Sequence, residues 1–394
     1  MHVATTEDTN RPAADRLPAS HRPVRPDRLR PLREAARHAL PALAAYTVIR
    51  MVGVLTVYVW ARNTGRAPGE RLASSDGIRY LKIAQQGYDG FAEVQSDMAF
   101  FPLFPGLVAV LDRILPLDAQ DVGLIVAWVA GLAAAWGLFA IGAHLHNRRT
   151  GVLLAALWAA LPHAVVQSMA YSETLFTALA VWTLYALLRG YWVTAGVVCL
   201  FAGLTRPTAT SLIPVVGLAA LLAIVRRRDG WRPWAAALLA PAGWLAYVAW
   251  VGSVVGRPDG WFHIQSAGWG STFDFGLDTL RRGRLALANP TAAQLFVVSV
   301  VLLLALMLFV LSVLDRQPWQ LLLYSTLMLV TTLGTAGYYH SKARFLLPAF
   351  PLLLPAAVAL ARAGWARAVT VLVAMAAFAT YFGGYLLLIW KWSP

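Results

Sequence analysis

Residues 292–314 read AAQLFVVSVVLLLALMLFVLSVL, an apolar segment without a charged side chain. About 20 such residues in a helix cross the hydrocarbon core of a bilayer, which is roughly 30 Å thick. Runs of similar character recur from residue 38 to the end of the sequence. Hydrophobic residues make up 59% of the chain and charged residues 13%, against roughly 45–50% and about 25% in soluble domains. The sequence therefore predicts an all-α polytopic membrane protein whose apolar surface faces lipid.

The apolar runs predict about eleven membrane-spanning helices. They lie near residues 38–61, 122–145, 151–170, 174–189, 192–206, 208–225, 233–255, 292–314, 318–336, 344–361 and 366–389. Pro207 interrupts the pair at 192–225, which could form one broken element. The segment 99–115 is short for a span and carries two prolines near its start, so we expect an interfacial or re-entrant helix there.

The first 37 residues differ in kind from the rest. They are rich in Pro and Arg and have no apolar period, which is typical of a disordered basic tail. We expect this tail, 1–37, to precede one multispanning domain, 38–394. The formal net charge of +14 requires no nucleic acid as a partner, because basic cytoplasmic loops and anionic membrane lipids account for it. The single cysteine, Cys199, excludes a disulfide and a Cys-based metal site.

The placement of arginine predicts the orientation in the cell membrane. The basic tail puts the N-terminus in the cytoplasm, and the arginine-bearing turns near residues 148, 189, 226–232, 316 and 362–367 then fall on the same side. Under this topology the loops 62–121 and 256–291 and the turn 338–344 face the outside. We therefore expect an extracytoplasmic site, with interfacial helices in the first of these loops.

The stretch SSDGIRYLKIAQQGY, residues 74–88, is the first polar segment that needs a reason. Its apolar residues recur at helical spacing from Ile78 to Tyr88, which favours a helix lying in the membrane interface. Asp76 falls in the first turn of this helix. Either Ser75 or Asp76 caps the free backbone N–H groups, or the Asp76 carboxylate is held about 3 Å from a hydroxyl group as a general base. Both functions can hold together.

Two charged residues at the ends of spans, and one inside a span, also need a reason. Glu173, in AYSETLF, is either an interfacial residue in contact with water or a carboxylate paired in a cavity. Arg206 stands directly before Pro207, where it either snorkels to the interface or binds an anion such as a phosphate. Arg50, inside the first span, could serve a buried ion pair or helix packing.

The turn YYHSKAR, residues 338–344, gathers His340, Lys342 and Arg344 on the predicted outer face. Three cations there oppose the positive-inside trend, which favours an anion site. The segment WFHIQSAGWG offers His263, Gln265 and Trp269, either as a sugar platform or as part of an aromatic belt.

The sequence has no P-loop, G-x-S-x-G or H-E-x-x-H motif. A carboxylate and a group of cations beside lipid fit the transfer of a group from a membrane-anchored phosphate donor.

Four pieces of sequence, in order, resemble one family. SDGIRYLKIAQQGY…AFFPLFPGL, AYSETLFTAL, AGLTRPTA and SKARFLLPAFPLL resemble the class V phosphatidylinositol-glycan mannosyltransferases (GPI mannosyltransferase II-like) and their bacterial relatives. These are multispanning GT-C glycosyltransferases that use a polyprenyl-phosphate sugar. The resemblance runs from roughly residue 40 to 390. The family usually has Trp-Asp, then a His three residues after the Asp and an aromatic residue; here Ser75 and Arg79 replace the Trp and the His, whereas Asp76 and Tyr80 agree.

The resemblance implies a reaction and a set of roles. Asp76 would be the catalytic base, and an acceptor hydroxyl of a lipid, glycan or protein would displace polyprenyl phosphate from a mannosyl unit with inversion. Four residues are expected to bind the donor phosphate: Arg206 and Arg344 as members of shared motifs, and His340 and Lys342 by their charge and placement alone. The residues expected near the substrate are Arg79, Tyr80, Glu173, His263, Gln265 and Trp269. Apart from the resemblance, a divalent metal near Asp76 is compatible with the sequence, which does not require one.

Two other classes of protein remain as alternatives. A transporter or flippase of a lipid-linked sugar predicts functional charges near the bilayer midplane and broken helices there. The hypothesis of a structural membrane scaffold does not explain why cations gather on the outer face.

Overall fold

The structure is a computed structural model that describes residue 2, residues 30–90 and residues 94–394. The chain divides into two units, Met1–Arg37 and His38–Pro394. Most of the predicted tail lies outside the described residues. Of the first unit the structure describes residue 2 and residues 30–37, and helix α1 begins at Arg30.

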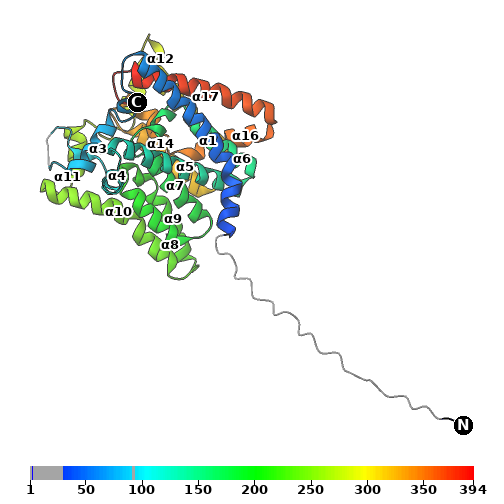
Figure 1. Cartoon of the computed structure of the whole chain (residues 1–394). Helices are drawn as coiled ribbons and strands as arrows, with labels where there is room; N and C mark the ends of the chain where they lie inside the picture. Colours follow the sequence, from blue (N-terminus) through cyan, green and yellow to red (C-terminus); the bar gives the residue numbers. More distant parts are fainter. Residues whose placement is uncertain (1, 3–29, 91–93) are drawn as a thin grey trace. The chain divides into compact units, whose positions relative to one another are not determined.

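The described residues are folded almost entirely into helices (Figure 1). The α-helices are α1 Arg30–Asn63, α2 Pro68–Leu72, α3 Asp76–Gln86, α4 Leu103–Asp112, α5 Ala119–Leu145, α6 Arg148–Ala159, α7 Glu173–Leu188, α8 Trp192–Gly203, α9 Ile213–Val225, α10 Arg232–Val255, α11 Gly260–His263, α12 Leu277–Ala288, α13 Ala293–Leu314, α14 Trp319–Gly334, α15 Lys342–Phe345, α16 Leu354–Arg362 and α17 Trp365–Leu388. Short 3₁₀ segments are η1 Asp97–Ala99, η2 Ala164–Ser168, η3 Pro207–Ser211, η5 Tyr339–Ser341 and η6 Phe350–Leu353, and η4 Ile264–Gly268 is a π-turn. One isolated antiparallel bridge joins Phe273 to Thr335.

Six described helical segments are long and apolar enough to cross a membrane, which supports a multi-pass membrane protein. They are Glu34–Asn63, Ala119–Leu145, Pro207–Val225, Arg232–Val255, Ala293–Leu314 and Trp365–Leu388. A seventh span results if Tyr339–Phe345 and Phe350–Arg362, which are bent by 73° at their junction, count as one broken span. The predicted number of about eleven is therefore too high.

The excess spans were predicted because hydropathy adds apolar residues across the points where helices stop. Helix α6 ends at Ala159, shortly before a proline at position 162, and has 12 residues. Helix α8 also has 12 residues, whereas α7 and α14 have 16 each. At about 1.5 Å per residue, these helices are roughly 18–24 Å long, less than the bilayer core of roughly 30 Å. The segment 99–115 likewise contains only the 10-residue helix α4.

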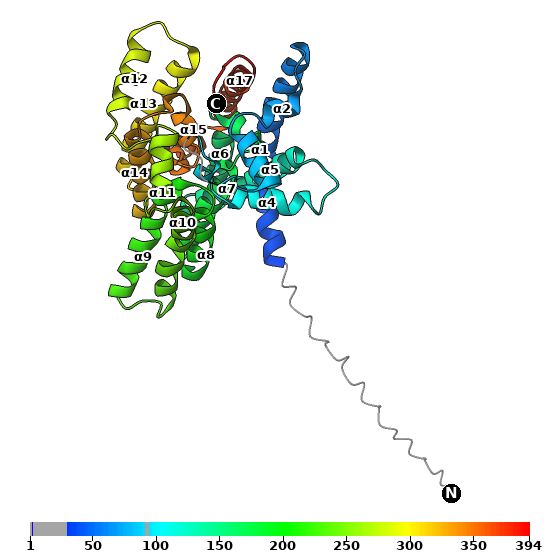
Figure 2. The same ribbon diagram turned by 90° about the vertical axis from the view of Figure 1, so that its left-hand side faces the viewer.

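Helices α8 and α10 approach each other closely because small residues face one another. A Cβ atom on Gly243 of α10 would lie 2.0 Å from the carbonyl oxygen of Leu200 in α8. A Cβ atom on Gly196 of α8 would lie 2.8 Å from the Cα atom of Ala236. Such contacts are typical of helix pairs in membranes, where close backbone approach replaces the hydrophobic driving force. Figures 1 and 2 show α8, α9 and α10 side by side.

The predicted helix in the first polar stretch is confirmed as α3, Asp76–Gln86. Its buried residues are Gly77, Tyr80 and Ile83, whereas Ile78 is 61% exposed. The helix therefore packs one edge against the bundle and presents an apolar side chain outward. An outward-facing isoleucine suits a helix at the edge of a lipid-solvated domain.

Candidate functional site

A cavity of about 710 Å³ brings together parts of the chain that are far apart in sequence. Its walls come from α3, η1 and the residues after it, η3, α10, α11 and the loop that follows, the end of α14, η5 and α15. Asp76, Arg206, Lys342 and Arg344 all line it. A pocket of this size with a few convergent polar groups is the usual form of a ligand site.

Asp76 is placed at the cavity by an unusual backbone turn. The preceding residue, Ser75, has φ 58° and ψ −119°, a conformation that non-glycine residues rarely adopt and that costs of order 1–3 kcal/mol. The Ser75 side chain makes no capping hydrogen bond. The backbone N–H of Asp76 instead donates to the Tyr171 hydroxyl at 3.2 Å. The structure thus gives no support to a side-chain cap at Ser75.

Arg344 joins two carboxylates that lie almost a hundred residues apart. Its Nη2 lies 2.8 Å from Oδ2 of Asp76, and its Nε lies 3.4 Å from Oε1 of Glu173. Its Nη1 donates to the Ser393 hydroxyl at 2.9 Å. The guanidinium also lies over the Tyr171 ring, 5.3 Å from the centroid. Nη1 and Nη2 thus have close partners, whereas Nε has only its ion-pair contact with Glu173 and no hydrogen-bond partner among the described residues.

Arg206 continues the same cluster on the other side of Glu173. Its Nη1 lies 2.8 Å from Oε2 of Glu173 and donates to the Ser172 hydroxyl at 2.9 Å. Ser172 in turn shares a 2.6 Å hydrogen bond with the Tyr80 hydroxyl. Burial raises the pKa of the Tyr80 phenol, so this hydroxyl group stays neutral and acts through hydrogen bonds.

We refer to Asp76, Glu173, Arg206 and Arg344 as the charge cluster. It contains two carboxylates and two guanidinium groups, so its formal charge balances. The side chains of Glu173 and Arg344 are 2% and 5% exposed, whereas that of Asp76 is 24% exposed. Glu173 is therefore the buried centre of the cluster and not an interfacial residue in water, and Asp76 is the carboxylate most open to a ligand.

The other two predicted cations do not join this cluster. The Lys342 ammonium group donates to the backbone carbonyl of Thr332 at 2.7 Å and to that of Thr335. It thus binds free carbonyl groups near the C-terminal end of α14, where a cation is favourable. His340 is not among the residues that line the cavity. Its ring packs between Tyr338 and Trp390.

Of the remaining predicted site residues, Tyr80, His263, Gln265 and Trp269 line the cavity. The Trp269 indole N–H donates to the carbonyl of Ser96 at 3.2 Å. Arg79 lies behind this wall, where its guanidinium covers the Trp269 ring and pairs with Asp97 at 3.0 Å. Arg79 therefore supports the wall from outside.

Six buried polar atoms of residues on the cavity wall have no hydrogen-bond partner within the described part of the chain. They are Trp244 Nε1, Trp261 Nε1, Thr208 Oγ1, Thr332 Oγ1, Ser341 Oγ and Arg344 Nε. Buried polar groups are normally satisfied. These atoms are available to hydrogen-bond water or a polar ligand in the cavity.

Arg50 hydrogen-bonds to buried groups of neighbouring helical segments. Its side chain donates to the carbonyl of Ala159 at 3.3 Å and to the Ser168 hydroxyl at 3.2 Å. No described carboxylate pairs with it. Arg50 therefore binds the C-terminal end of α6 and η2, and the predicted alternative of a buried ion pair is not met by the described residues.

The described residues contain no group of three or more His, Cys, Asp and Glu side chains that could hold a metal ion. The two carboxylates of the charge cluster are already paired with arginines. This arrangement does not fit a divalent cation, which prefers several carboxylate or carbonyl oxygens.

Three further residues of the site were not predicted from the sequence. Tyr171 and Ser172 directly precede Glu173 and are fully buried; their polar side chains beside a buried carboxylate were the available signal. Ser393 carried no local signal, because its contact with Arg344 joins segments 49 residues apart.

No protein-family model matches the chain, and no curated protein matches it significantly. The class of protein therefore rests on the fold and on the geometry of the cavity. The fold defines a helical multi-pass membrane protein, and the cavity defines a candidate site for a polar ligand.

Proposed function

We propose that this protein is a membrane glycosyltransferase of the GT-C type. It moves a hexosyl unit, by the sequence resemblance a mannosyl unit, from a polyprenyl-phosphate donor to an acceptor hydroxyl on the extracytoplasmic face. The acceptor is a lipid, a glycan or a protein. The observation that carries this proposal is the partly open Asp76 carboxylate on the wall of a 710 Å³ cavity, next to two arginines.

Asp76 acts as the general base. It accepts the proton of the acceptor hydroxyl while the acceptor oxygen bonds to the anomeric carbon. The bond from that carbon to the phosphate oxygen breaks, and polyprenyl phosphate leaves with the electron pair. One displacement inverts the anomeric configuration. Arg344 and Arg206 stabilise the charge on the leaving phosphate, because guanidinium groups match phosphate geometry.

The contacts within the charge cluster imply an order in which the donor and the acceptor bind. Arg344 Nη2 contacts Asp76, and Nη1 contacts the neutral Ser393 hydroxyl. A donor phosphate competes for both nitrogens. When it takes Nη2, it releases the Asp76 carboxylate for the acceptor hydroxyl. The donor therefore binds before the acceptor.

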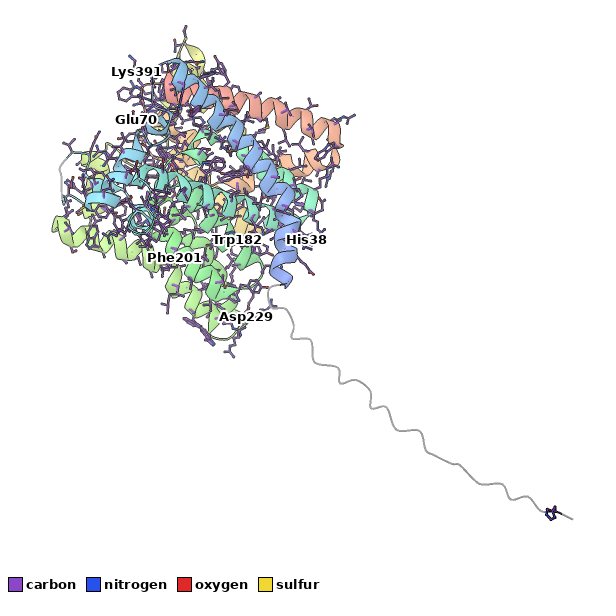
Figure 3. The ribbon with its side chains drawn as sticks, in the orientation of Figure 1. His38, Glu70, Trp182, Phe201, Asp229 and Lys391 are labelled. Carbon is purple, nitrogen blue, oxygen red and sulfur yellow. The ribbon has the colours of Figure 1, made fainter. Side chains whose placement is uncertain are left out.

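The positions of the loops support the proposed extracytoplasmic site. Glu70 and Lys391 lie at one end of the second unit, whereas Asp229, next to the basic turn after α9, lies at the other (Figure 3). A cytoplasmic location of the basic turn puts Glu70 and the first polar loop outside.

A flippase for a lipid-linked sugar is the second candidate, and one observation favours it. Arg344 lies in the bent pair of helices, and Arg206 stands at the break between α8 and α9. Charges at broken helices are typical of transporters. The two functions differ in their products, because only a transferase breaks the sugar–phosphate bond.

The test is the substitution Asp76→Asn in the purified protein reconstituted into lipid nanodiscs. The substrate is radiolabelled polyprenyl-phosphate mannose, with membrane extract as acceptor. A general base contributes typically 10²–10⁴ in rate, so turnover should fall by that factor while donor binding and thermal stability persist. Asp89→Asn, which changes an exposed carboxylate of the same loop, is the matched control and should transfer normally.

Normal transfer by Asp76→Asn would move the base elsewhere. A parent protein that is inert as a transferase but moves the donor across proteoliposome membranes would replace the transferase by the flippase.

A further inference from the structure

Helix α12, Leu277–Ala288, presents its leucines outward. Leu277, Leu280 and Leu287 are 69%, 72% and 47% exposed. With Arg281 and Arg284 they recur at the helical spacing of one face, and both arginines are exposed. A helix of this composition in water would turn its leucines toward the core.

The opposite face of α12 is built from small residues that pack on the bundle. Thr279 and Ala286 are buried, and the Thr279 hydroxyl donates to the carbonyl of Leu333 in α14 at 2.6 Å. A Cβ atom on Gly283 would lie 3.2 Å from the Tyr339 hydroxyl. These close contacts fix the orientation of α12, and this orientation places the leucines on the outward face.

The arginines of α12 differ in their partners. Arg282 pairs with Asp278 one turn earlier at 2.7 Å. Arg281 and Arg284 have no carboxylate partner among the described residues. The outward face thus combines three leucines with two positive charges that nothing in the described chain neutralises.

The position of α12 places this face at the end of a membrane span. The helix is joined by four residues to α13, Ala293–Leu314, one of the six candidate spans, and packs beside it (Figure 2). The turn before α12 carries Phe275, which is 86% exposed. Figures 1 and 3, drawn in one orientation, place α12 at the opposite end from Asp229 and its basic turn.

Whichever end of the second unit is cytoplasmic, one group of exposed arginines lies on the outer side of the membrane. Arg226–Arg228 lie at one end of the second unit and Arg281–Arg284 at the other. Arginine is disfavoured in short loops on the outer side of a membrane. One of the two groups therefore departs from that rule, and under the predicted topology it is the group on α12.

We propose that α12 is an interfacial helix that binds anionic phospholipid. Its leucines enter the upper acyl-chain region, and Arg281 and Arg284 pair with lipid phosphate groups. Outward leucines with arginines between them are the composition by which helices lie in a headgroup layer, and long arginine side chains reach phosphates from an apolar surface. The inference does not depend on the glycosyltransferase proposal.

The lipid site would adjoin the cavity. The backbone N–H of Gly337 faces Oδ2 of Asp278 at 3.3 Å, and Phe273, shortly before α12, bridges to Thr335. Phe273, Thr335 and Gly337 all line the cavity. A phospholipid on the outward face of α12 would therefore bind to a helix that contacts this wall.

The test uses a fluorescent probe on the outward face. Leu280→Cys is labelled with the environment-sensitive dye NBD; the native Cys199 is buried and should not react. The labelled protein, in detergent micelles, is titrated with nitroxide-labelled phosphatidylglycerol or with nitroxide-labelled phosphatidylcholine, which quench the dye at short range. We expect quenching by both lipids, with phosphatidylglycerol effective at lower concentration.

Each arginine near an anionic lipid surface contributes about 1 kcal/mol, which is roughly fivefold in affinity. The double variant Arg281→Gln, Arg284→Gln should therefore lose roughly twenty- to thirtyfold in affinity for phosphatidylglycerol and leave the quenching by phosphatidylcholine unchanged. The control Arg226→Gln, Arg228→Gln removes two exposed arginines at the far end and should leave the titration at position 280 unchanged.

Three results would overturn the proposal. Equal affinity of the parent protein for the two lipids would show that α12 does not recognise the charge of the lipid. An unchanged phosphatidylglycerol titration in the Arg281→Gln, Arg284→Gln variant would show that these two arginines do not bind the lipid. Absence of quenching by either lipid, with dye emission that depends on protein concentration, would assign the face to a second copy of the chain.

Discussion

Glu173 offers the sharpest test of the charge cluster, because two arginines depend on it. The substitution Glu173→Gln keeps the size of the side chain and removes its charge. Among the described residues, Arg206 then retains the Ser172 hydroxyl as its one partner, whereas Arg344 keeps Asp76 at 2.8 Å. Arg206 is therefore the arginine that loses most of its ion-pair stabilisation.

The magnitude follows from the burial of the pair. The Glu173 and Arg206 side chains are 2% and 11% exposed, and their atoms are 2.8 Å apart. Removing one partner of a buried ion pair destabilises a protein by about 3–5 kcal/mol, because an uncompensated charge remains. At roughly 2 °C per kcal/mol for a large domain, the midpoint of thermal unfolding should fall by roughly 6–10 °C.

The assay is thermal unfolding of the purified protein in detergent, with Glu70→Gln as the control. Glu70 is exposed in α2, so its substitution should change stability by less than about 0.5 kcal/mol. The double variant Glu173→Gln, Arg206→Gln removes both charges and should be more stable than Glu173→Gln alone. An unfolding midpoint for Glu173→Gln within about 1 °C of the parent would refute the buried pair, and so would a double variant whose losses simply add.

Three further predictions address topology, donor binding and packing. A cysteine at Ser266 should react with an impermeant thiol reagent in intact cells, whereas one at Arg228 should react only after permeabilisation; the reverse pattern would invert the orientation. Arg344→Lys keeps the charge but loses the planar guanidinium group. Because a charge-assisted hydrogen bond contributes roughly 1.5–3 kcal/mol, binding of the donor to the purified protein should weaken on the order of tenfold or more. Unchanged affinity would show that Arg344 does not bind the donor. Gly243→Ala should lower thermal stability by about 1–3 kcal/mol or more through the clash with α8, whereas Gly217→Ala, which has open space around it, should be neutral or stabilising; equal effects would contradict the close contact between α8 and α10.

Composition predicted the helical membrane class, and helical spacing predicted α3 with Asp76 as its first residue. These features are local, because propensity and periodicity act over one or two turns. The number of spans could not be obtained in the same way. Hydropathy averages across the break after Ala159, whereas a helix ends where a proline removes a backbone donor.

The candidate site shows a similar limit. Lys342 and Arg344 are two residues apart in one short turn, yet Lys342 binds the carbonyls at the end of α14 and Arg344 binds Asp76 and Glu173. Sequence identifies both as cations on the same segment. Their partners depend on which direction each side chain takes from the turn, and this direction is set by packing against segments far away in the chain.

The charge cluster also has a consequence for biosynthesis. Asp76, Glu173 and Arg206 leave the ribosome well before Arg344, which follows after more than a third of the chain. At 5–20 residues per second, this interval lasts on the order of ten seconds. During it Glu173 can pair with Arg206, whereas Asp76 has no arginine from α15. Asp76 is therefore neutralised by Arg344 only late in translation, and a nascent chain that stops before Arg344 lacks this partner for the Asp76 carboxylate.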